Sequence, residues 1–257
     1  MSSISNKKWA IVLSSDLHFG SVHSSHGIDI RDDKRNHVQK IIDMKDEHNV
    51  EIVISAGDIT DYGTNGICCF CSNNNNNSED ELTPLINNWV KPLENAGLDV
   101  LLTAGNHDTY TGHPYFHKPV LRYLKKKYNA TYWPWFWMKY NGCYAYSKNN
   151  VLILSLGIYP KNLKFLKKNL PKDKKDPVII FYHYNTVNEP YADWWKEDEK
   201  DAFYEVIKDY NIIAINNGHY HTTYEKEWRG FRIFNSAGTQ LIRFNMNNNK
   251  IESVDFI

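Results

Sequence analysis

The chain has 257 residues, of which 42% are hydrophobic, enough to bury a sizeable core. Its 30 basic and 30 acidic residues give a formal net charge of zero, so bulk charge indicates neither a nucleic acid nor an anionic membrane as its partner. Its 4 cysteines are too few for a disulfide scaffold, and three of them crowd into one segment, which favours reduced thiols in a reducing compartment.

The N-terminal segment predicts a soluble protein. Its first apolar run, residues 9–13, ends at Ser14 and is too short for a signal-peptide core or a membrane span. No later run approaches spanning length. We therefore expect a soluble, cytoplasmic protein with no membrane partner.

The first half of the chain alternates between predicted strands and helices. Residues 9–15, 50–57 and 99–105 are short, bounded apolar runs, as buried strands are. Helical spacing of apolar residues predicts one helix around 38–45 and a second over 81–96. This β-α-β-α-β order predicts a largely parallel sheet with crossover helices.

The second half of the chain contains further predicted strands and several predicted hairpins. Asn141-Gly142, between aromatic flanks, predicts a hairpin over 136–147. Strands are predicted at 151–157, 177–183 and 212–218, with a lysine-rich helix and a helix near 199–210 between them. The tail predicts two hairpins, one turning at Arg229-Gly230 and one in its asparagines. Together these elements predict an α/β fold with two mixed sheets face to face and helices outside, in a single domain over 1–257.

An asparagine-rich stretch interrupts the first half near 64–80. The sequence "CCFCSNNNNNSED" (68–80) buries little and predicts a flexible insertion. Cys68, Cys69 and Cys71 could bind a soft metal, but no fourth ligand stands at zinc-site spacing. A plain surface loop is the preferred interpretation.

Polar side chains that can bind metals follow each of five predicted strands. They are Asp16, His18, Asp58, Asn106, His107, Asp108, His183, His219 and His221. Each motif alone is weak evidence for a metal site, because a single D-x-H or Gly-Asp is common by chance. In open α/β sheets, however, the functional crevice lies at the carboxyl ends of the strands. The ordered set "D-x-H, G-D, G-N-H-D, H, G-H-x-H" therefore predicts one site assembled from five loops.

This ordered set resembles the calcineurin-like metallophosphoesterase superfamily, from residue 16 to residue 221. The resemblance implies a four-layer αββα sandwich and a pair of metal ions. It implies that one ion is bound by Asp16, His18 and His221. It implies that the second is bound by Asn106, His183 and His219, and that Asp58 bridges the two.

The donor set indicates which ions and which chemistry to expect. Imidazole, carboxylate and amide donors suit two divalent ions of manganese, iron or zinc. We expect a metal-bridging hydroxide to attack phosphorus. His107 is the histidine left over once the ligands are assigned, and we expect it to be the general acid, with Asp108 orienting its ring and raising its pKa. Asp108 could equally cap a helix after Thr109.

The remaining histidines and tryptophans give weaker signals. His23 lies in the loop after the first motif, where substrate contact competes with a solvated loop role. Trp194 and Trp195 follow His183 and could form a stacking platform for a planar group or a small hydrophobic core. His37 and His48 have no motif context and are predicted to lie on a helix surface.

The preferred functional hypothesis is phosphodiester hydrolysis, with a nucleotide-like small molecule as one candidate substrate. A phosphomonoesterase or protein phosphatase is the first alternative, although "GNHD" is followed here by Thr109-Tyr110 and the nearest downstream arginine is Arg122. A repair nuclease is a weaker alternative, because the net charge is zero. The alternative from another class is a non-catalytic scaffold on the same fold, which would be expected to have lost ligands.

Overall fold

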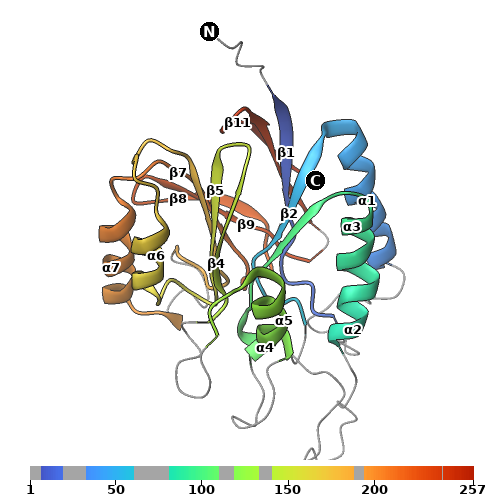
Figure 1. The fold of residues 1–257 in the computed structure, drawn as a ribbon, viewed down its shortest axis with the longest axis horizontal. Coiled ribbons are helices and arrows are strands. Elements are labelled where there is room, and N and C mark those ends of the chain that lie inside the picture. The colour runs from blue at the N-terminus through green and yellow to red at the C-terminus, as the bar shows by residue number, and fades with distance from the viewer. Residues whose placement is uncertain are drawn as a thin grey trace, which may run out of the picture.

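The computed structural model describes residues 7–19, 33–60, 81–109, 119–132, 141–187, 194–238 and 240–257. These segments form two β-sheets with helices on their outer faces (Figure 1), which confirms the predicted α/β fold. Within the same segments, no helix combines the length and the apolar character that crossing a bilayer requires. The predicted insertion near 64–80, with Cys68, Cys69 and Cys71, lies outside the described residues.

The first sheet has the strand order β11-β10-β1-β2-β3. Its strands are β1 (Lys8–Leu13), β2 (Val50–Ser55), β3 (Asp99–Leu102), β10 (Ile242–Asn247) and β11 (Lys250–Phe256). Strands β1, β2 and β3 are parallel, and β10 pairs antiparallel with both β1 and β11. The carboxyl ends of the three parallel strands therefore lie at the same edge.

The second sheet has the strand order β4-β5-β6-β7-β9-β8. Its strands are β4 (Cys143–Lys148), β5 (Val151–Leu156), β6 (Val178–Phe181), β7 (Ile212–Asn217), β8 (Tyr224–Trp228) and β9 (Phe231–Asn235). Strands β5, β6, β7 and β9 are parallel, while β4 and β8 close the two edges antiparallel. This sheet too is mixed, as predicted.

Helices cover the outer face of each sheet (Figure 1). The first sheet is covered by α1 (Asp33–His48) and by the continuous segment of α2 (Leu82–Leu85), a π-helical turn η1 (Ile86–Val90) and α3 (Lys91–Asn95). The second sheet is covered by α6 (Leu163–Asn169) and α7 (Glu197–Ile207). The lysines of α6 are exposed, while Leu166 is fully buried. Two further helices, α4 (Asn106–Thr109) and α5 (Pro119–Tyr128), follow β3.

Strand β6 shows how the core is divided between two layers. Ile179 and Phe181 belong to the cluster between the two sheets, whereas Val178 and Ile180 pack in the cluster on the side of α6 and α7. Alternate residues of a strand point to opposite faces, so a strand with both faces buried reads as a continuous apolar run. The sheets also touch directly, because the ring centroids of Phe234 on β9 and Phe244 on β10 lie 4.6 Å apart.

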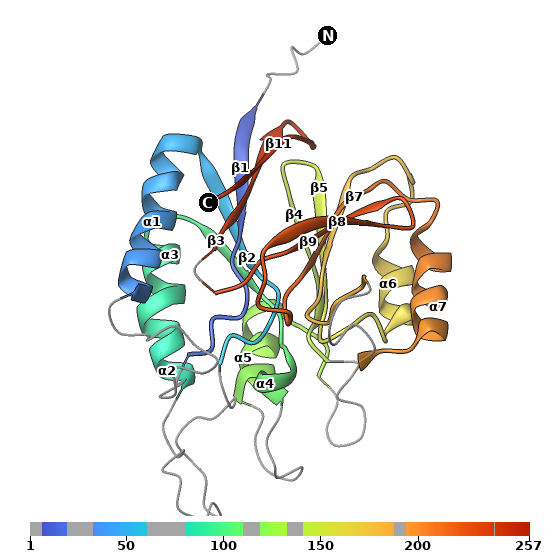
Figure 2. The ribbon, with the colours of Figure 1, turned by 180° about the vertical axis from the view of Figure 1, so that it is seen from behind.

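The C-terminal half ends in two hairpins, one in each sheet (Figure 2). Arg229 and Gly230 join β8 to β9 with φ values of 52° and 86°, as the left-handed positions of a tight hairpin turn require. Asn248, with φ of 55°, lies in the turn between β10 and β11. Both predicted tail hairpins are confirmed.

Strands β4 and β5 form a hairpin that the sequence analysis did not predict. Strands β4 and β5 are joined by Asn149 and Asn150, with φ values of 52° and 61°. Asparagine tolerates the left-handed conformation, so this pair serves the turn as well as Asn-Gly would. At the predicted turn, Gly142 N–H donates to the Thr131 carbonyl, and residues 133–140 lie outside the described part of the chain.

His37 does not lie on a helix surface, so that prediction was wrong. Its ring is only 4% exposed, and its Nε2 lies 2.8 Å from the Ser14 hydroxyl at the end of β1. The helix face that contacts the sheet carries His37 beside Val38 and Ile41, so the imidazole is buried with them and takes a polar partner there. His48, by contrast, has a side chain that is 38% exposed, as predicted.

Candidate metal centre

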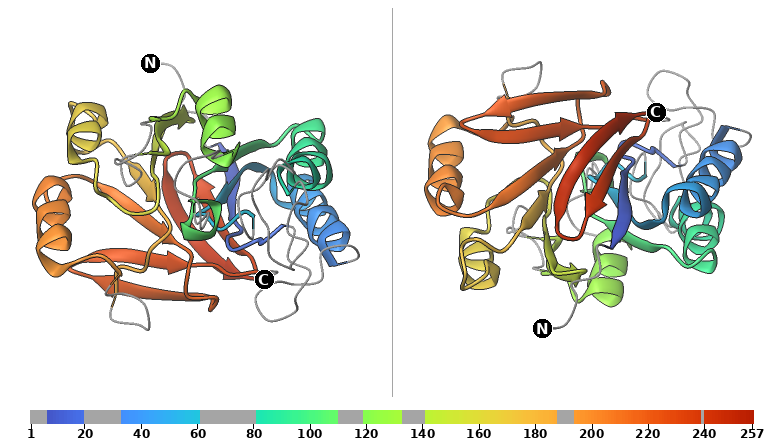
Figure 3. Two further views of the ribbon diagram at one scale, coloured as in Figure 1. Left: turned by 90° about the horizontal axis from the view of Figure 1, so that it is seen from below. Right: turned by 90° about the horizontal axis from the view of Figure 1, so that it is seen from above.

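The predicted ligands all follow the carboxyl ends of strands. Asp16 and His18 follow β1, Asp58 follows β2, and Asn106 begins α4 after β3. His183 follows β6, and His219 and His221 follow β7. These ends meet at the lower edge of the molecule in Figure 1, which Figure 3 (left) views face on. The two sheets therefore supply loops to one site.

The ligand atoms form two overlapping groups. Those of Asp16, His18, Asp58 and His221 lie within 4.8 Å of one another, and so do those of Asp58, His183 and His219. Asp58 is the residue that the two groups share. Two ligand groups with one common carboxylate are the arrangement that a pair of cations with a bridging anion requires.

Individual distances place the remaining donors around Asp58. Asp58 Oδ2 lies 3.0 Å from His183 Nε2 and 3.9 Å from His18 Nε2. His183 Nε2 also lies 2.9 Å from the side-chain oxygen of Asn106. In the other group, His221 Nε2 lies 3.1 Å from His18 Nε2 and 3.5 Å from the Asp16 carboxylate. Asn106 therefore lies with the His183 group.

Hydrogen bonds from the backbone hold several ligands in place. His183 Nδ1 donates to the Ala56 carbonyl at 2.9 Å, so Nε2 is the ring atom that could bind a metal ion. The backbone N–H of His219 donates to Asp16 Oδ1, and that of His107 donates to Asp58 Oδ1, both at 2.8 Å. Neighbouring loops thus orient each other's ligands.

Burial and charge in this site shift several pKa values strongly. Burial by itself would raise the pKa of the Asp58 carboxyl, but His183, His18 and His107 together hold it below its usual range. For His183, burial opposes the charged form, yet the Asp58 carboxylate raises its pKa to about 9. Burial and the neighbouring His183 lower the pKa of His219 to about 3. Metal ligands must be deprotonated, so a cation here would replace the proton that Asp58 draws onto His183.

The donor set and one buried oxygen fit a metal pair. Asp16 Oδ2 is buried, and it has no hydrogen-bond partner in the described part of the chain. Its carboxylate would hold a cation together with His18 and His221, while His183, His219 and Asn106 would hold a second, with Asp58 between them. Nitrogen and oxygen donors of this kind suit manganese, iron or zinc. Among the described cysteines, Cys143 is buried on β4 and does not belong to either ligand group.

The glycines of the G-D, G-N-H-D and G-H-x-H motifs, to which the sequence analysis gave no role of their own, make room for these ligands. A Cβ on Gly105 would lie 2.1 Å from Asp58 Oδ1, and one on Gly218 would lie 2.6 Å from Asp16 Oδ2. A Cβ on Gly57 would lie 2.8 Å from His183 Nδ1. Each glycine directly precedes a predicted ligand, and that adjacency is the sequence signal that could have identified them.

The Asp108 carboxylate is buried and bonds to backbone groups of two loops. Its carboxylate accepts hydrogen bonds from the backbone N–H groups of Gly105, Ile59 and Thr60 and from the Thr60 hydroxyl, at 2.7 to 3.2 Å. Burial and the nearby Asp58 charge raise its pKa to about 6, against the effect of these bonds. The bond to Gly105 caps α4 itself, and the others fasten the loop after Asp58 to α4. Asp108 thus orders the backbone of two ligand loops.

The structure separates the two tryptophans that were proposed to contact substrate. Trp194 is 46% exposed and its ring centroid lies 4.4 Å from that of His219. Trp195 is only 1% exposed, and its indole N–H donates to the Asn185 carbonyl at 2.7 Å. Trp195 is therefore a core residue, and Trp194 is the one at the site. His23 lies outside the described residues.

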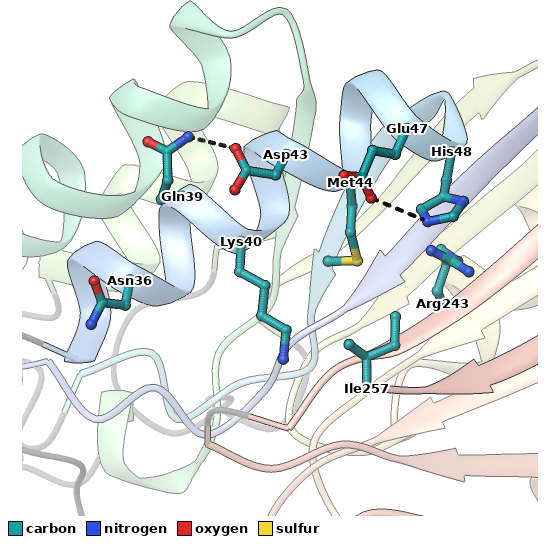
Figure 4. A pocket seen from close by; sticks show the side chains of 9 residues that line it. All are labelled: Asn36, Gln39, Lys40, Asp43, Met44, Glu47, His48, Arg243 and Ile257. Atoms are coloured by element: carbon teal, nitrogen blue, oxygen red, sulfur yellow. Dashed lines mark hydrogen bonds and ion pairs between the residues drawn. The ribbon is translucent and has the colours of Figure 1, made fainter.

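A pocket of the described surface lies away from the ligand groups, along α1. Its volume is about 590 Å³ (Figure 4). It is lined by Asn36, Gln39, Lys40, Asp43, Met44, Glu47, His48, Arg243 and Ile257. Most of these side chains belong to α1, some pair with one another, as Gln39 does with Asp43, and none is a predicted ligand. The chemistry of the ligand groups, not pocket size, identifies the functional site.

Comparisons with known proteins agree with this geometry. The family model described as calcineurin-like phosphoesterase matches residues 10–223. No curated protein sequence matches the chain significantly. The structure of a dimetal phosphatase from Danio rerio is 13% identical with a TM-score of 0.63, and the match covers 97% of this chain and 98% of that one.

Two further solved structures share the fold at similar sequence distance. GAP50, the anchor in the inner membrane complex of Plasmodium, is 11% identical with a TM-score of 0.56, over 96% of this chain and 88% of that one. A purple acid phosphatase from yellow lupin is 11% identical with a TM-score of 0.60, over 98% of this chain and 54% of that one. The family match spans the whole ligand set from Asp16 to His221, and the chain belongs to the calcineurin-like phosphoesterases.

Proposed function

We propose that the protein is a dinuclear metal-dependent phosphoesterase that hydrolyses a phosphodiester, with His107 as the general acid. The observation that carries the proposal is the pair of ligand groups that share Asp58. Two divalent cations held there supply Lewis-acid stabilisation of phosphoryl oxygens and acidify water at neutral pH. The family membership supports the reaction class, and the diester preference and the role of His107 are our proposal.

The position of His107 supports its role as the acid. It follows the ligand Asn106 on α4, its backbone N–H donates to Asp58 Oδ1, and its ring centroid lies 4.7 Å from that of His18. Its side chain is partly exposed, so its imidazole is accessible at the edge of the ligand groups. An imidazole there can donate a proton to the oxygen that leaves phosphorus.

The charges around the site support a diester more than a monoester. The groups that shift the pKa values of His183 and His219 are the carboxylates and imidazoles of the site itself. Among the arginines whose side chains the structure describes, Arg229, Arg232 and Arg243 pair with carboxylates elsewhere, each at 2.6 Å. A monoester carries an additional negative charge, which bidentate guanidinium groups commonly bind. A diester has only one charge, which two cations can neutralise.

A phosphomonoesterase is the second candidate. Two of the similar solved structures are named phosphatases, the Danio rerio and lupin proteins, at an identity where the likeness extends to the fold. Manganese as the ion in the cell, a small-molecule substrate and a cytoplasmic location stay predictions. The non-catalytic scaffold is less well supported, because the predicted ligands are all present and brought together, with His107 beside them.

Metal analysis combined with turnover tests the proposal. The purified protein, loaded with manganese and desalted, should hold two ions per chain by elemental analysis. It should hydrolyse bis(p-nitrophenyl) phosphate with a higher kcat/KM than p-nitrophenyl phosphate. A higher kcat/KM for the monoester would establish the second candidate instead. Two bound ions with no hydrolysis of either ester would leave the scaffold as the function.

A further inference from the structure

Trp194 is an exposed aromatic residue at the metal centre. Among the described residues the exposed large hydrophobic side chains are Trp194, at 46%, and Phe256, at 50%. The Trp194 ring centroid lies 4.4 Å from that of the ligand His219, with the ring planes 60° apart. A single exposed aromatic residue is common at a protein surface, so the contact with His219, not the exposure alone, singles out Trp194.

Tyr184 extends this surface behind Trp194. Its ring centroid lies 5.4 Å from that of Trp194 and 5.0 Å from that of His219. On its other side, Tyr184 stacks on Tyr159 at 5.7 Å with the planes 10° apart. Tyr184 and Trp194, which we call the aromatic surface, therefore border the His183–His219 side of the ligand groups.

The neighbouring Trp195 holds the aromatic surface in position. Its buried indole donates to the carbonyl of Asn185, the residue after Tyr184, at 2.7 Å. Its ring contacts those of Tyr159 and Tyr182, at 5.7 and 5.8 Å, and the Lys200 ammonium lies 5.7 Å from its centroid. Trp195 is thus fixed in the core. Its hydrogen bond to Asn185 ties the segment that carries Trp194 to the segment that carries Tyr184. A rigid aromatic residue binds a planar ligand with little loss of conformational entropy.

We propose that Trp194 and Tyr184 bind a planar aromatic group, such as a nucleobase, carried on one ester arm of the phosphate substrate. This inference rests on the proposed function, because it takes the phosphate to be bound at the Asp58-centred ligand groups. Trp194 is in ring contact with His219, so a group attached to that phosphate lies within reach of the indole. Stacking on aromatic side chains accepts any base, because every base has a π-face.

The opposing interpretation is that Trp194 only shields His219 from water. If Trp194 only shields His219, its removal should lower kcat/KM for every ester. If Trp194 is a stacking surface, its removal should lower kcat/KM only for esters with a planar group. The test therefore compares thymidine 5′-(p-nitrophenyl phosphate) with methyl p-nitrophenyl phosphate. Both release p-nitrophenol, and they differ only in the second ester arm.

The variants are Trp194→Ala and Trp194→Phe, with Phe256→Ala as the matched control on the edge strand β11. Trp194→Ala should lower kcat/KM for the thymidine ester about tenfold, the scale of one lost stacking contact, and leave the methyl ester within about twofold. Trp194→Phe should keep most of the preference for the thymidine ester over the methyl ester. Phe256→Ala should leave kcat/KM unchanged for both substrates. Equal losses on both esters, or no loss on either, would overturn the proposal.

A binding measurement separates this inference from the proposed function. By calorimetry, the manganese-loaded protein should bind AMP about tenfold more tightly than ribose 5-phosphate, and Trp194→Ala should remove that difference. If both ligands bind the wild-type protein equally, the aromatic surface has no such role. If the difference is present but no ester is hydrolysed, the binding surface stands and the proposed catalytic function fails.

Discussion

Five of the seven candidate ligands adopt the left-handed backbone conformation, which non-glycine residues rarely do. The φ values are 56° for Asp16, 44° for His18, 47° for Asp58, 73° for His219 and 51° for His221. Each such residue costs on the order of 1–3 kcal/mol, and such strain persists where the surrounding structure over-determines it. Here the left-handed conformation turns each side chain back toward the other candidate ligands directly after its strand. The site therefore carries strain that the rest of the fold must offset.

The role of His107 can be tested by truncating its side chain. His107→Ala should retain both metal ions, because the ligand groups do not include this imidazole. Turnover of esters with poor leaving groups should fall by about 10²–10⁴-fold, the usual contribution of a general acid. The loss should be smaller for p-nitrophenyl esters, whose leaving group needs little protonation.

The matched control for that experiment is His48→Ala, since His48 lies on α1 with a side chain that is 38% exposed. It should leave metal content and turnover unchanged. If elemental analysis shows that His107→Ala holds fewer ions than the wild type, His107 is a ligand and the assignment is wrong.

At the scale of single elements, the turns after the strands depend on glycines that lie against ligands. Gly105 precedes α4, and an added Cβ would lie 2.1 Å from Asp58 Oδ1 and 2.4 Å from the Asp58 backbone nitrogen. The backbone nitrogen cannot move aside as a flexible side chain can. Gly105→Ala therefore forces α4 and the loop after β2 apart.

We expect Gly105→Ala to lower the free energy of unfolding by about 1–3 kcal/mol, as overpacking of a buried site does. It should also weaken binding of both ions, since it displaces the carboxylate that the two ligand groups share. Chemical denaturation and metal titration measure the two effects. Gly230→Ala is the control: a Cβ there meets no atom within 4 Å, so only its left-handed φ of 86° adds strain. If the two variants bind metal equally well, the close approach of Gly105 has no functional role.

At the scale of the whole molecule, the ligands join the two sheets. Asp16, His18, Asp58 and Asn106 follow strands of the first sheet, and His183, His219 and His221 follow strands of the second. Ions held between them would connect loops that also share hydrogen bonds such as His219 N–H to Asp16. A ligand that binds only the folded state raises its stability by mass action.

Metal removal should therefore lower the melting temperature. At an ion concentration of about 100 times Kd, one site adds about 2.7 kcal/mol. For a domain of this size, a loss of 1 kcal/mol in the free energy of unfolding lowers Tm by about 2–4 °C. A chelator that removes the ion should therefore lower Tm by roughly 5–10 °C. Asp58→Asn, which weakens the shared bridge, should show a much smaller shift with or without the chelator. Equal shifts in both proteins, measured by scanning calorimetry, would contradict the bridging role of Asp58.

Much of the fold could be predicted because local patterns and packing agree. The apolar runs at 9–15, 50–57 and 212–218 are buried strands in both sheets. Turn residues with a left-handed preference placed the hairpin at Arg229-Gly230 correctly. The same rule also accounts for the turn between β4 and β5, where Asn149 and Asn150 take left-handed φ values, although no hairpin was predicted there. Local preference names the candidates for a turn, and pairing with a distant strand chooses among them.

The sequence by itself determined which residues are candidate ligands, because each of them follows an apolar strand and parallel strands present their carboxyl ends together. Only the tertiary structure decided that Trp195 is buried and Trp194 exposed, that His37 binds Ser14, and that Asp108 holds the loop after Asp58. The physical reason is distance along the chain. The partners of His37 and Asp108 lie 23 and 48 residues away, and neither burial nor hydrogen bonding across such a separation follows from neighbouring residues.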